Sequence, residues 1–504
     1  MRGLVFISTG EDVQRFLYSG AFEAIQAKHN LAYVFADPQS RRGIKLDIGS
    51  LMLPRVEYIP FHQKRFDKWV ELFDVACVAY QDSSPSFMIR FRMKSANFPK
   101  KHLPSLNWRH PITLRRFVGA IKTILLNEPR RRKFIRLERL GKSTTYSQYR
   151  ETVISSLGLH PEMARLVKNY QPDFIILPSC LLDSMTNDVL QIADYYKIPS
   201  FLLVSGWDNL SSKGILFHQP TTIAVWGEQT RRHAVDIQRM SPENVFCIGA
   251  PHYEAFRMPL ARDRNAIRQS IGLPIDEKVV LFGGSFRQFD ETSLLRQIEE
   301  AIETGTVPRI HILYRPHPWR QEREEDNFFD YAWKHVTMDP VLCKAYRETK
   351  ISRRYIGSNE LLFSMSYLNE LYRIVDAVIS PMSTLILEAM IFGNPVLAVA
   401  LDDGKHLWSA DKTSQMTHFQ ELSSVQGVTF CRKSSEFIPL FRQLVLSSDD
   451  LVLRESLRRS TRCFVLQADS SYAERLNKLV NERLQWSYEH RTIRSTDTTG
   501  QALY

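Results

Sequence analysis

The segment 376–400, DAVISPMSTLILEAMIFGNPVLAVA, places two hydroxyls and a carboxylate around the start of a predicted helix. Ser383 and Thr384 follow a short apolar run that Pro381 ends, and they stand where a helix N-cap is expected. Free N–H groups and a partial positive charge at a helix start favour phosphate. Glu388, four residues after Thr384, would share its face and reach a ribose diol. A capped helix in an ordinary βαβ unit would explain the same spacing.

A second motif, YRPHP at 314–318, follows the apolar run HIL. Arg315 could clamp a phosphate, and His317 could donate to a phosphate oxygen or act as an acid. The two prolines beside the histidine restrict its backbone. A rigid loop with a solvated Arg–His pair is the alternative interpretation.

The third motif is FGGSF at 282–286, after the strand-like run VVL. Gly283 and Gly284 would let the backbone approach a ligand closely. Ser285 and Arg287 would add a hydroxyl and a positive charge to the same cleft. The pattern is neither GxGxxG nor a P-loop, so taken alone it is a weak signal.

A fourth motif, GWDNLSSKG at 206–214, follows the apolar run FLLVS. An aspartate at a strand end in a cleft could be the general base for an acceptor hydroxyl, which makes Asp208 a catalytic candidate. Lys213 could neutralise a phosphate, and Trp207 and Asn209 would lie at the mouth of the acceptor site. An Asx turn organised by Asp208 and Asn209 would explain the loop without catalysis.

The elements that must position these motifs begin at the first residues of the chain. Apolar runs predict a strand at 4–8, a helix near 16–27 and a second strand at 31–37. This order opens a doubly wound domain, in which ligands bind at the carboxyl ends of the strands. The loop after the first strand therefore places three more residues at the cleft edge: Gly10, Glu11 and Asp12.

Two βαβ series are predicted in the rest of the chain. Further strands are expected at 174–179, 198–204, 223–227, 245–251, 279–285, 309–318, 376–381 and 395–400. Helices are expected at 184–196, 228–239, 291–303, 367–375, 384–392 and 472–484. This alternation predicts an α/β protein with two doubly wound, Rossmann-like domains that face each other across a cleft. The predicted units are 1–255 for the acceptor, 256–475 for the donor, and 476–504 as a C-terminal helix and flexible tail.

A basic, partly helical insertion is predicted in the first domain at about 40–150. Between Arg90 and Lys142 there are sixteen Lys and Arg residues against the two acids Glu128 and Glu138. The net charge of this segment is +14, whereas that of the whole chain is +11. The rest of the chain therefore has a net charge of about −3. Basic residues mixed with aromatic ones suit an anionic membrane or a lipid-linked phosphate. No nucleic-acid motif is present, so no nucleic acid is expected as a partner. A solvated basic face is the alternative.

Several classes of protein are disfavoured by what the sequence lacks. No apolar run approaches the ~20 residues that span a bilayer, and the N-terminus resembles a strand more than a signal peptide. The six cysteines are scattered without a CxxC pair, so neither a zinc site nor a disulfide framework is predicted. No DxD motif is present, and no metal ligand or cofactor is predicted. We expect a cytoplasmic protein, or one held peripherally on the inner face of the plasma membrane.

Five motifs together resemble bacterial surface-carbohydrate GT-B glycosyltransferases: GWDNLSSKG, VWGEQTRRHAVD, VFCIGAPHYEAF, YRPHP and ISPMSTLILEAMIFGNPVLAV. A wider resemblance extends to CDP-glycerol glycerophosphotransferases and UDP-GlcNAc 2-epimerase-like proteins. It covers the opening strand and about 161–476. The resemblance implies that His317, Ser383 and Thr384 contact the phosphates of a nucleotide-sugar donor. It also implies that Glu388 meets ribose or sugar hydroxyls.

Two departures refine the expected reaction. The chain reads SPMST where glycerophosphotransferases usually read TDYSS, which favours a sugar donor. The glutamate pair typical of retaining enzymes is absent, since Val396 stands eight residues after Glu388, and this favours inversion. The predicted protein is a metal-independent, inverting glycosyltransferase that acts on a surface-polysaccharide or lipid-linked glycan acceptor. A sugar-nucleotide epimerase, a CDP-polyol phosphotransferase and a non-catalytic basic membrane-binding protein are the alternatives.

Overall fold

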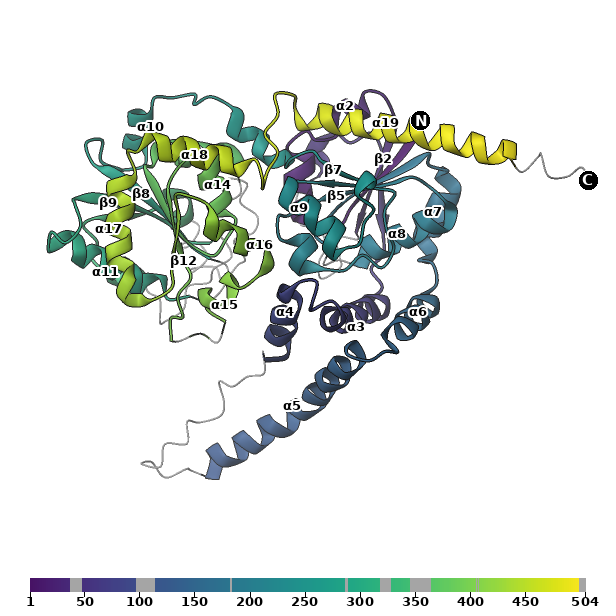
Figure 1. Cartoon of the computed structure of the whole chain (residues 1–504), viewed down its shortest axis with the longest axis horizontal. Coiled ribbons are helices and arrows are strands. Elements are labelled where there is room, and N and C mark those ends of the chain that lie inside the picture. The colour runs from purple at the N-terminus through teal and green to yellow at the C-terminus, as the bar shows by residue number, and fades with distance from the viewer. Residues whose placement is uncertain are drawn as a thin grey trace, which may run out of the picture.

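The structure is a computed structural model that describes residues 1–36, 48–96, 114–181, 184–285, 289–317, 328–344, 364–404, 406 and 408–497. Within these residues the strands form two wholly parallel sheets, each covered by helices (Figure 1). Parallel sheets bury both faces, which is why most of the predicted strands are near-continuous apolar runs.

The N-terminal sheet has the strand order β3-β2-β1-β4-β5-β6-β7. Its strands are β1 (Arg2–Ile7), β2 (Asn30–Ala36), β3 (Val56–Ile59), β4 (Phe174–Ser179), β5 (Ser200–Val204), β6 (Thr222–Val225) and β7 (Val245–Cys247). The chain winds outward from β1 to one edge and then returns to fill the other side. The order reverses between β1 and β4, and this reversal defines the topological switch point of a doubly wound fold.

The C-terminal sheet repeats this plan in the order β10-β9-β8-β11-β12-β13. Its strands are β8 (Lys278–Gly283), β9 (Ile310–Arg315), β10 (Val336–Met338), β11 (Ala377–Pro381), β12 (Val396–Val399) and β13 (Val428–Cys431). Its switch point lies between β8 and β11. Both sheets therefore have the Rossmann order, which confirms the predicted fold class of two doubly wound α/β domains.

Helices connect the strands and cover both faces of each sheet. In the first half of the chain they include α1 (Gly10–Asp12), η1 (Val13–Leu17), α2 (Glu23–Gln26), α3 (Gln63–Ala79), α4 (Pro85–Ala96), α5 (Leu114–Gly141), α6 (Tyr146–Leu157), α7 (Pro161–Tyr170), α8 (Ser184–Tyr196), η4 (Asn209–Lys213), α9 (Glu228–Arg232) and η5 (His233–Ile237). In the second half they include η7 (Pro251–Arg257), α10 (Arg264–Ser270), α11 (Glu291–Glu303), α13 (Met365–Ile374), α14 (Leu385–Ile391), α15 (Ala410–Ser414), α16 (Thr417–Gln420), α17 (Phe437–Ser447), α18 (Leu451–Thr461) and α19 (Tyr472–Asp497).

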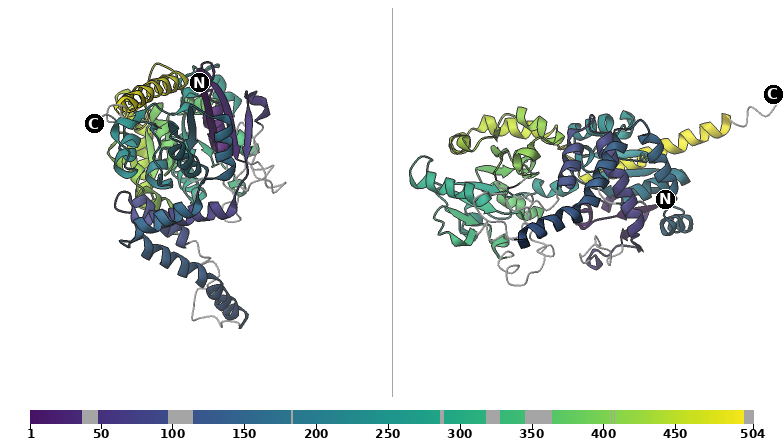
Figure 2. Two further views of the ribbon diagram at one scale, coloured as in Figure 1. Left: turned by 90° about the vertical axis from the view of Figure 1, so that its right-hand side faces the viewer. Right: turned by 90° about the horizontal axis from the view of Figure 1, so that it is seen from below.

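The predicted insertion at about 40–150 needs correction, because part of it belongs to the sheet. β3 pairs in parallel with β2, and α3 follows it. This strand was not predicted because it lies at the sheet edge and has no continuous apolar run. Val56 and Tyr58 are 37% and 50% exposed there. The helical part of the insertion includes α5, which runs through the basic residues with Pro129 inside it. α5 projects away from the body of the molecule (Figures 1 and 2).

The last helix, α19, returns to the N-terminal domain and lies along it (Figure 1). Tyr472, Leu476 and Val480 are buried in the same apolar cluster as β1 and β2. Arg475 Nε donates to the carbonyl of Ile248 at 2.9 Å. The helix continues to Asp497, beyond the predicted end at 484, and residues 498–504 lie outside the described part. The end of the chain therefore ties the second domain to the first.

Candidate active site

The predicted donor residues meet at one edge of the C-terminal sheet. β9, β8 and β11 are neighbours in the sheet, and their carboxyl ends carry the motifs at 314–318, 282–286 and 380–384. The glycine turn after β8 and the hydroxyls after β11 stand on either side of the switch point. A crevice at this place is where doubly wound domains bind their ligands. Arg287, one of the predicted donor residues, lies outside the described residues.

The glycine turn allows close approach between parts of the protein itself. A Cβ on Gly283 would collide with the Leu385 side chain of α14. A Cβ on Gly284 would lie 2.9 Å from both the Cα of Pro316 and the backbone N of His317. The Gly284 N–H also donates to the Arg315 carbonyl at 2.8 Å. The glycines therefore bring the turn after β8 against the loop after β9 and the start of α14.

A matched pair of substitutions tests this packing. We expect Gly284→Ala to destabilise the protein by about 1–3 kcal/mol, the usual range for overpacking, because backbone atoms would have to move. Gly283→Ala should destabilise it less, because the far end of the Leu385 side chain can shift. Urea unfolding of both variants measures the difference. Equal free energies of unfolding for the two variants would contradict this account.

Next to this turn, Ser285 and Glu291 close the start of α11. The Ser285 N–H donates to Glu291 Oε1, and the hydroxyl of Tyr314 donates to Glu291 Oε2, both at 2.8 Å. The Glu291 side chain is fully buried. Ser285 is thus part of a buried network through its backbone, while its predicted contact with a donor stays a prediction.

Ser383 and Thr384 were predicted to act alike at the helix start, but their hydroxyls have different hydrogen-bond partners and different exposure. The Ser383 Oγ lies 2.8 Å from Ser380 Oγ and accepts from the Leu385 N–H at 3.3 Å. Thr384 is at the N-cap position with helical backbone angles, φ −64° and ψ −18°, and its hydroxyl makes no capping bond. The side chain of Thr384 is exposed. The expected cap is therefore formed by Ser383, and Thr384 offers an exposed hydroxyl.

Glu388 lies in the first turn of α14, close to the switch point of the sheet, and is 7% exposed. The Tyr372 hydroxyl donates to its Oε2 at 2.8 Å, and the Tyr253 hydroxyl donates to its Oε1 at 3.5 Å. Burial raises the pKa of Glu388, although Tyr372, Arg315 and Arg15 oppose the rise. A buried carboxylate among hydroxyl donors is suited to accept further hydroxyl groups. Its contact with a ribose diol stays a prediction.

Arg315 was predicted to bind a phosphate, but in the structure its guanidinium already has an anionic partner. Its side chain is 5% exposed and forms an ion pair with Asp339, which is fully buried. Its guanidinium carbon also lies 5.6 Å from the centre of the Tyr367 ring. His317, two residues further on, is half-buried beside the glycine turn. Arg315 therefore neutralises the buried carboxylate of Asp339, and its predicted contact with a phosphate stays a prediction.

On the opposite wall, the predicted loop at Gly10–Asp12 is the first turn of a helix, which corrects the expected start at 16. Thr9 caps it by accepting from the Asp12 N–H at 3.2 Å, so helical geometry begins directly after β1. Asp12 is fully buried, and its carboxylate accepts from Ser205 Oγ at 2.5 Å. Asp12 therefore joins the loops after β1 and β5. Glu11 stays on the surface, with its side chain 40% exposed.

The predicted acceptor loop at 206–214 contains the π-helical turn η4, which Asp208 precedes. Asp208 Oδ2 pairs with Lys213 Nζ at 3.1 Å, and Asn209 Nδ2 donates to Asp208 Oδ1 at 3.2 Å. Burial alone would raise the pKa of Asp208, but Lys213 and His418 lower it well below its ordinary value. As a base, this carboxylate is weak while Lys213 stays in contact. Asn209 Oδ1 accepts from the Gly206 N–H at 2.5 Å, and the Ser212 hydroxyl donates to the Asp208 carbonyl at 2.9 Å, so side chains of the loop itself hold its shape.

Trp207 was expected at the acceptor mouth, and the structure places it elsewhere. It is 1% exposed, and its indole N–H donates to Gln229 Oε1. Its ring packs edge-on against His418 and Phe419 of α16, with centroids 4.9 and 5.2 Å away. Trp207 therefore contacts the second domain, because the loop after β5 reaches across to α16.

Two residues that interact with the sequence-predicted sites, Arg15 and Tyr253, were not predicted from the sequence. Arg15 Nη1 donates to the Ser205 carbonyl at 2.6 Å, and its charge acts on both Asp208 and Glu388. Tyr253 reaches Glu388 from the segment that links the domains. Two features of the sequence could have indicated them. Arg15 stands five residues after the first strand–helix turn, and Tyr253 belongs to the aromatic run of the linker.

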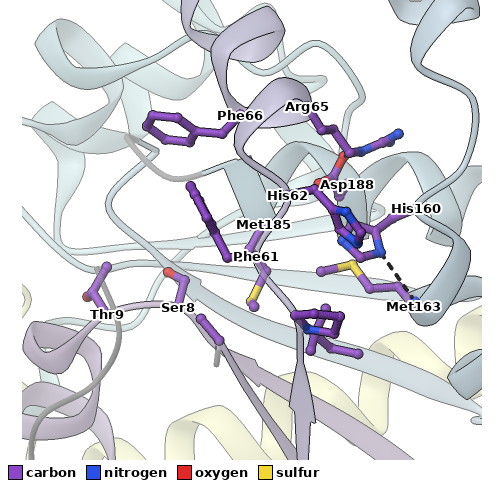
Figure 3. A pocket seen from close by; sticks show the side chains of 13 residues that line it. Ser8, Thr9, Phe61, His62, Arg65, Phe66, His160, Met163, Met185 and Asp188 are labelled. Carbon is purple, nitrogen blue, oxygen red and sulfur yellow. Dashed lines mark hydrogen bonds and ion pairs between the residues drawn. The ribbon is translucent and has the colours of Figure 1, made fainter. Parts of the chain in front are cut away.

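A small pocket of about 50 Å³, partly open to solvent, lies at the carboxyl ends of β1, β2 and β3 (Figure 3). Ser8 and Thr9 line one side, and His62 and His160 line another. Burial lowers the pKa of His160 to about 4, and the charge of Arg65 adds to the effect. The lining also includes Ala36, Ile59, Pro60, Phe61, Arg65, Phe66, Met163, Met185 and Asp188. The sequence analysis predicted no site here.

Comparisons with protein-family models and with curated proteins found no match to this chain. Among solved structures, the chain is similar to UDP-N-acetylglucosamine 2-epimerase from Rickettsia bellii, at 12% identity and TM-score 0.49, over 96% of this chain and 97% of that one. It is also similar to a glycosyltransferase from Rickettsia africae, at 10% identity and TM-score 0.44, over 96% and 98%. A third similar structure is the UDP-GlcNAc 2-epimerase from Neisseria meningitidis bound to UDP-GlcNAc. It has 12% sequence identity and a TM-score of 0.44, over 96% of this chain and 100% of that one. The fold assignment itself rests on the order of the strands.

The chain thus has two domains, each built on a parallel sheet with Rossmann strand order. Between them, Trp207 after β5 packs against His418 of α16, and Tyr253 of the linker contacts Glu388 of α14. Among the described residues, no helix is long and apolar enough to cross a membrane.

Proposed function

We propose that this protein is a glycosyltransferase that takes a sugar from a nucleotide-activated donor. The donor's diphosphate lies in the crevice between β8 and β11, and its ribose meets Glu388. The acceptor approaches from the N-terminal domain, where Asp12 and Asp208 lie. Hydroxyls, backbone N–H groups and arginine side chains stabilise the leaving diphosphate without a metal at this position.

One observation carries this proposal: the buried Glu388 lies close to the switch point of the C-terminal sheet and accepts from two tyrosine hydroxyls. Tyr372 reaches it from α13 and Tyr253 from the linker, while Arg315 and Arg15 act on its charge from the two domains. A nucleoside diphosphate presents hydroxyls for a carboxylate and phosphates for the arginines. The crevice therefore combines the two kinds of group that this ligand requires.

We expect Glu388→Gln to weaken nucleoside diphosphate binding by about 10- to 100-fold, since a hydrogen bond to a charged group contributes about 1.5–3 kcal/mol. A thermal-shift panel of UDP, GDP and CDP selects the nucleotide, and calorimetry then measures its affinity. The wild-type protein should also lose affinity for the 2′-deoxy and 3′-deoxy forms. The Gln variant should no longer distinguish at least one of them from the parent nucleotide.

The control for this experiment is Glu370→Gln, the same chemical change on α13, where Glu370 pairs with Arg262 at 3.3 Å. This variant should bind the nucleotide as the wild-type protein does. Equal binding by Glu388→Gln and Glu370→Gln would remove Glu388 from the donor site. If no nucleotide in the panel binds the wild-type protein, the proposed function itself is wrong.

A lipid-linked or surface-glycan acceptor is proposed because α5 presents a row of exposed basic side chains. These are Arg130, Arg131, Arg132, Lys133 and Arg136. Glu128 and Glu71 pair with four of them, so the local field is reduced but stays positive. An anionic membrane on the cytoplasmic side would attract this helix. Sedimentation with vesicles that contain phosphatidylserine, at low and high salt, tests the attraction.

An epimerase of the same architecture would need no acceptor. Incubation of the selected donor alone separates the two reactions: an epimerase produces a new sugar isomer, whereas a transferase leaves the sugar unchanged or slowly hydrolyses it. Release of a nucleoside monophosphate instead of a diphosphate would indicate a polyol-phosphate transferase.

A further inference from the structure

Three metal-ligating side chains that the proposed function does not use gather at the pocket of the N-terminal domain. They are His62 and His160, which line the pocket, and Glu162 beside them, and one ligand atom from each lies within 4.8 Å of the others. Glu162 Oε2 lies 3.0 Å from His62 Nε2 and 3.3 Å from His160 Nδ1. The two imidazole rings stand edge-on, with centroids 4.9 Å apart (Figure 3).

We propose that these three residues bind a divalent cation of the zinc class on the wall of this pocket. Two imidazole nitrogens and one carboxylate oxygen are a usual ligand set for Zn²⁺. Metal–ligand distances of about 2.0–2.2 Å in a tetrahedron separate neighbouring ligand atoms by roughly 3.3 Å. Two of the three separations, 3.0 and 3.3 Å, are close to that value, and all three ligand atoms lie within 4.8 Å of one another.

The fold fixes the three ligands from two helix starts. His62 directly precedes α3, and His160 directly precedes α7, which carries Glu162 in its first turn. His160 Nδ1 accepts from the Met163 N–H at 3.5 Å, the outer limit of a hydrogen bond. A cation would therefore displace only a weak capping interaction. His62 and Glu162 are partly exposed, with side chains 41% and 28% accessible, so a cation can enter from solvent.

The charges around the three ligands are compatible with a cation. Arg65 faces the pocket, but its Nε donates to Asp188 Oδ1 at 2.7 Å, and its other nitrogens donate to the carbonyls of Leu157 and Gly158 at 2.7 Å. Asp188 thus neutralises the charge of Arg65, and the carboxylate of Glu162 supplies the negative charge that attracts the metal. The start of each helix contributes partial positive charge, which weakens cation binding and favours an anion beside the cation.

Three protein ligands leave one position of a tetrahedral metal open. His62 and His160 both line the pocket, together with the hydroxyl-bearing Ser8 and Thr9. With two helix starts nearby, the open position favours an anionic oxygen, as in a phosphate. The site would then hold a phosphate or ionised oxygen of a pocket ligand, on the acceptor side of the cleft. This inference does not depend on the donor crevice.

The test uses the full chain after chelator treatment, with Zn²⁺ titrated against a chromophoric chelator and Co²⁺ as a spectroscopic probe. We expect one Zn²⁺ per chain and a Co²⁺ absorption typical of tetrahedral coordination. His62→Ala and Glu162→Gln should each weaken binding by more than about tenfold, the loss usual for even an outer-sphere partner. His160→Asn keeps an N-cap acceptor and should do the same.

The matched control is His335→Ala. His335 Nε2 also lies 3.0 Å from a carboxylate, that of Glu303, but no second histidine joins this pair in the metal-ligand groups of the described residues. This variant should bind Zn²⁺ as the wild-type protein does. Absence of saturable binding, or equal losses in His335→Ala and His62→Ala, would overturn the proposal. Added inorganic phosphate should change the Co²⁺ spectrum, and an unchanged spectrum would refute the anionic fourth ligand.

Discussion

Replacing Arg315 by Leu should lower the free energy of unfolding by about 3–5 kcal/mol, the usual cost of removing one partner of a buried ion pair. The reason is Asp339, which is fully buried and would keep its charge without a counter-ion. It would still accept from the Val341 N–H at 2.9 Å and the Tyr367 hydroxyl at 3.0 Å. Urea unfolding at neutral pH measures the loss.

Two further variants decide whether charge is the cause. Arg315→Leu combined with Asp339→Asn removes the stranded charge but keeps an acceptor for the same donors, so it should recover more than about 1 kcal/mol of the loss. Arg309→Leu removes an exposed arginine that pairs with Glu277 at 2.6 Å, and it should cost less than about 1 kcal/mol. If the single and double variants unfold alike, the ion pair does not explain the burial of Arg315.

The second large effect concerns catalysis. We expect Asp208→Asn to lower the rate of sugar transfer by about 100- to 10,000-fold, the range for loss of a general base, with donor affinity unchanged. The control is Asp236→Asn, the same change at an exposed position on η5, which should leave the rate unchanged. Transfer at the wild-type rate by Asp208→Asn would show that Asp208 is not the base.

The pH dependence of the reaction separates Asp208 from other bases. Lys213 and His418 hold the pKa of Asp208 well below 3.8, so the rate should not fall through loss of this base until the pH is below that value. Lys213→Met removes the ion pair at 3.1 Å, so the pKa of Asp208 should rise and the acid limb of the profile should move to higher pH. The same pair stabilises the fold above pH 3.8, and that contribution is lost as the pH falls. A profile that does not move in Lys213→Met would assign the limb to another group.

The sequence determined the architecture because its strands and helices are set by local patterns. The strand at Phe174–Ser179 and the helices at Ser184–Tyr196 and Glu291–Glu303 have the predicted bounds, since continuous apolar runs and 3.6-residue periodicity survive without tertiary context. The same patterns placed the glycine turn and the hydroxyl pair after neighbouring strands. Short edge strands such as β3 were missed because half of their side chains face solvent.

Only the tertiary structure decided what each side chain contacts. Arg315 is buried against Asp339, which stands 24 residues later, and Trp207 is buried against His418, more than 200 residues away. His62 meets Glu162, which stands 100 residues later, because two helices start side by side. No local pattern encodes such pairs, because the energy of an ion pair or a ring contact depends on distance in space. The sequence therefore predicted which residues could bind a phosphate-bearing ligand, and the fold decided which of these residues are already held in other contacts.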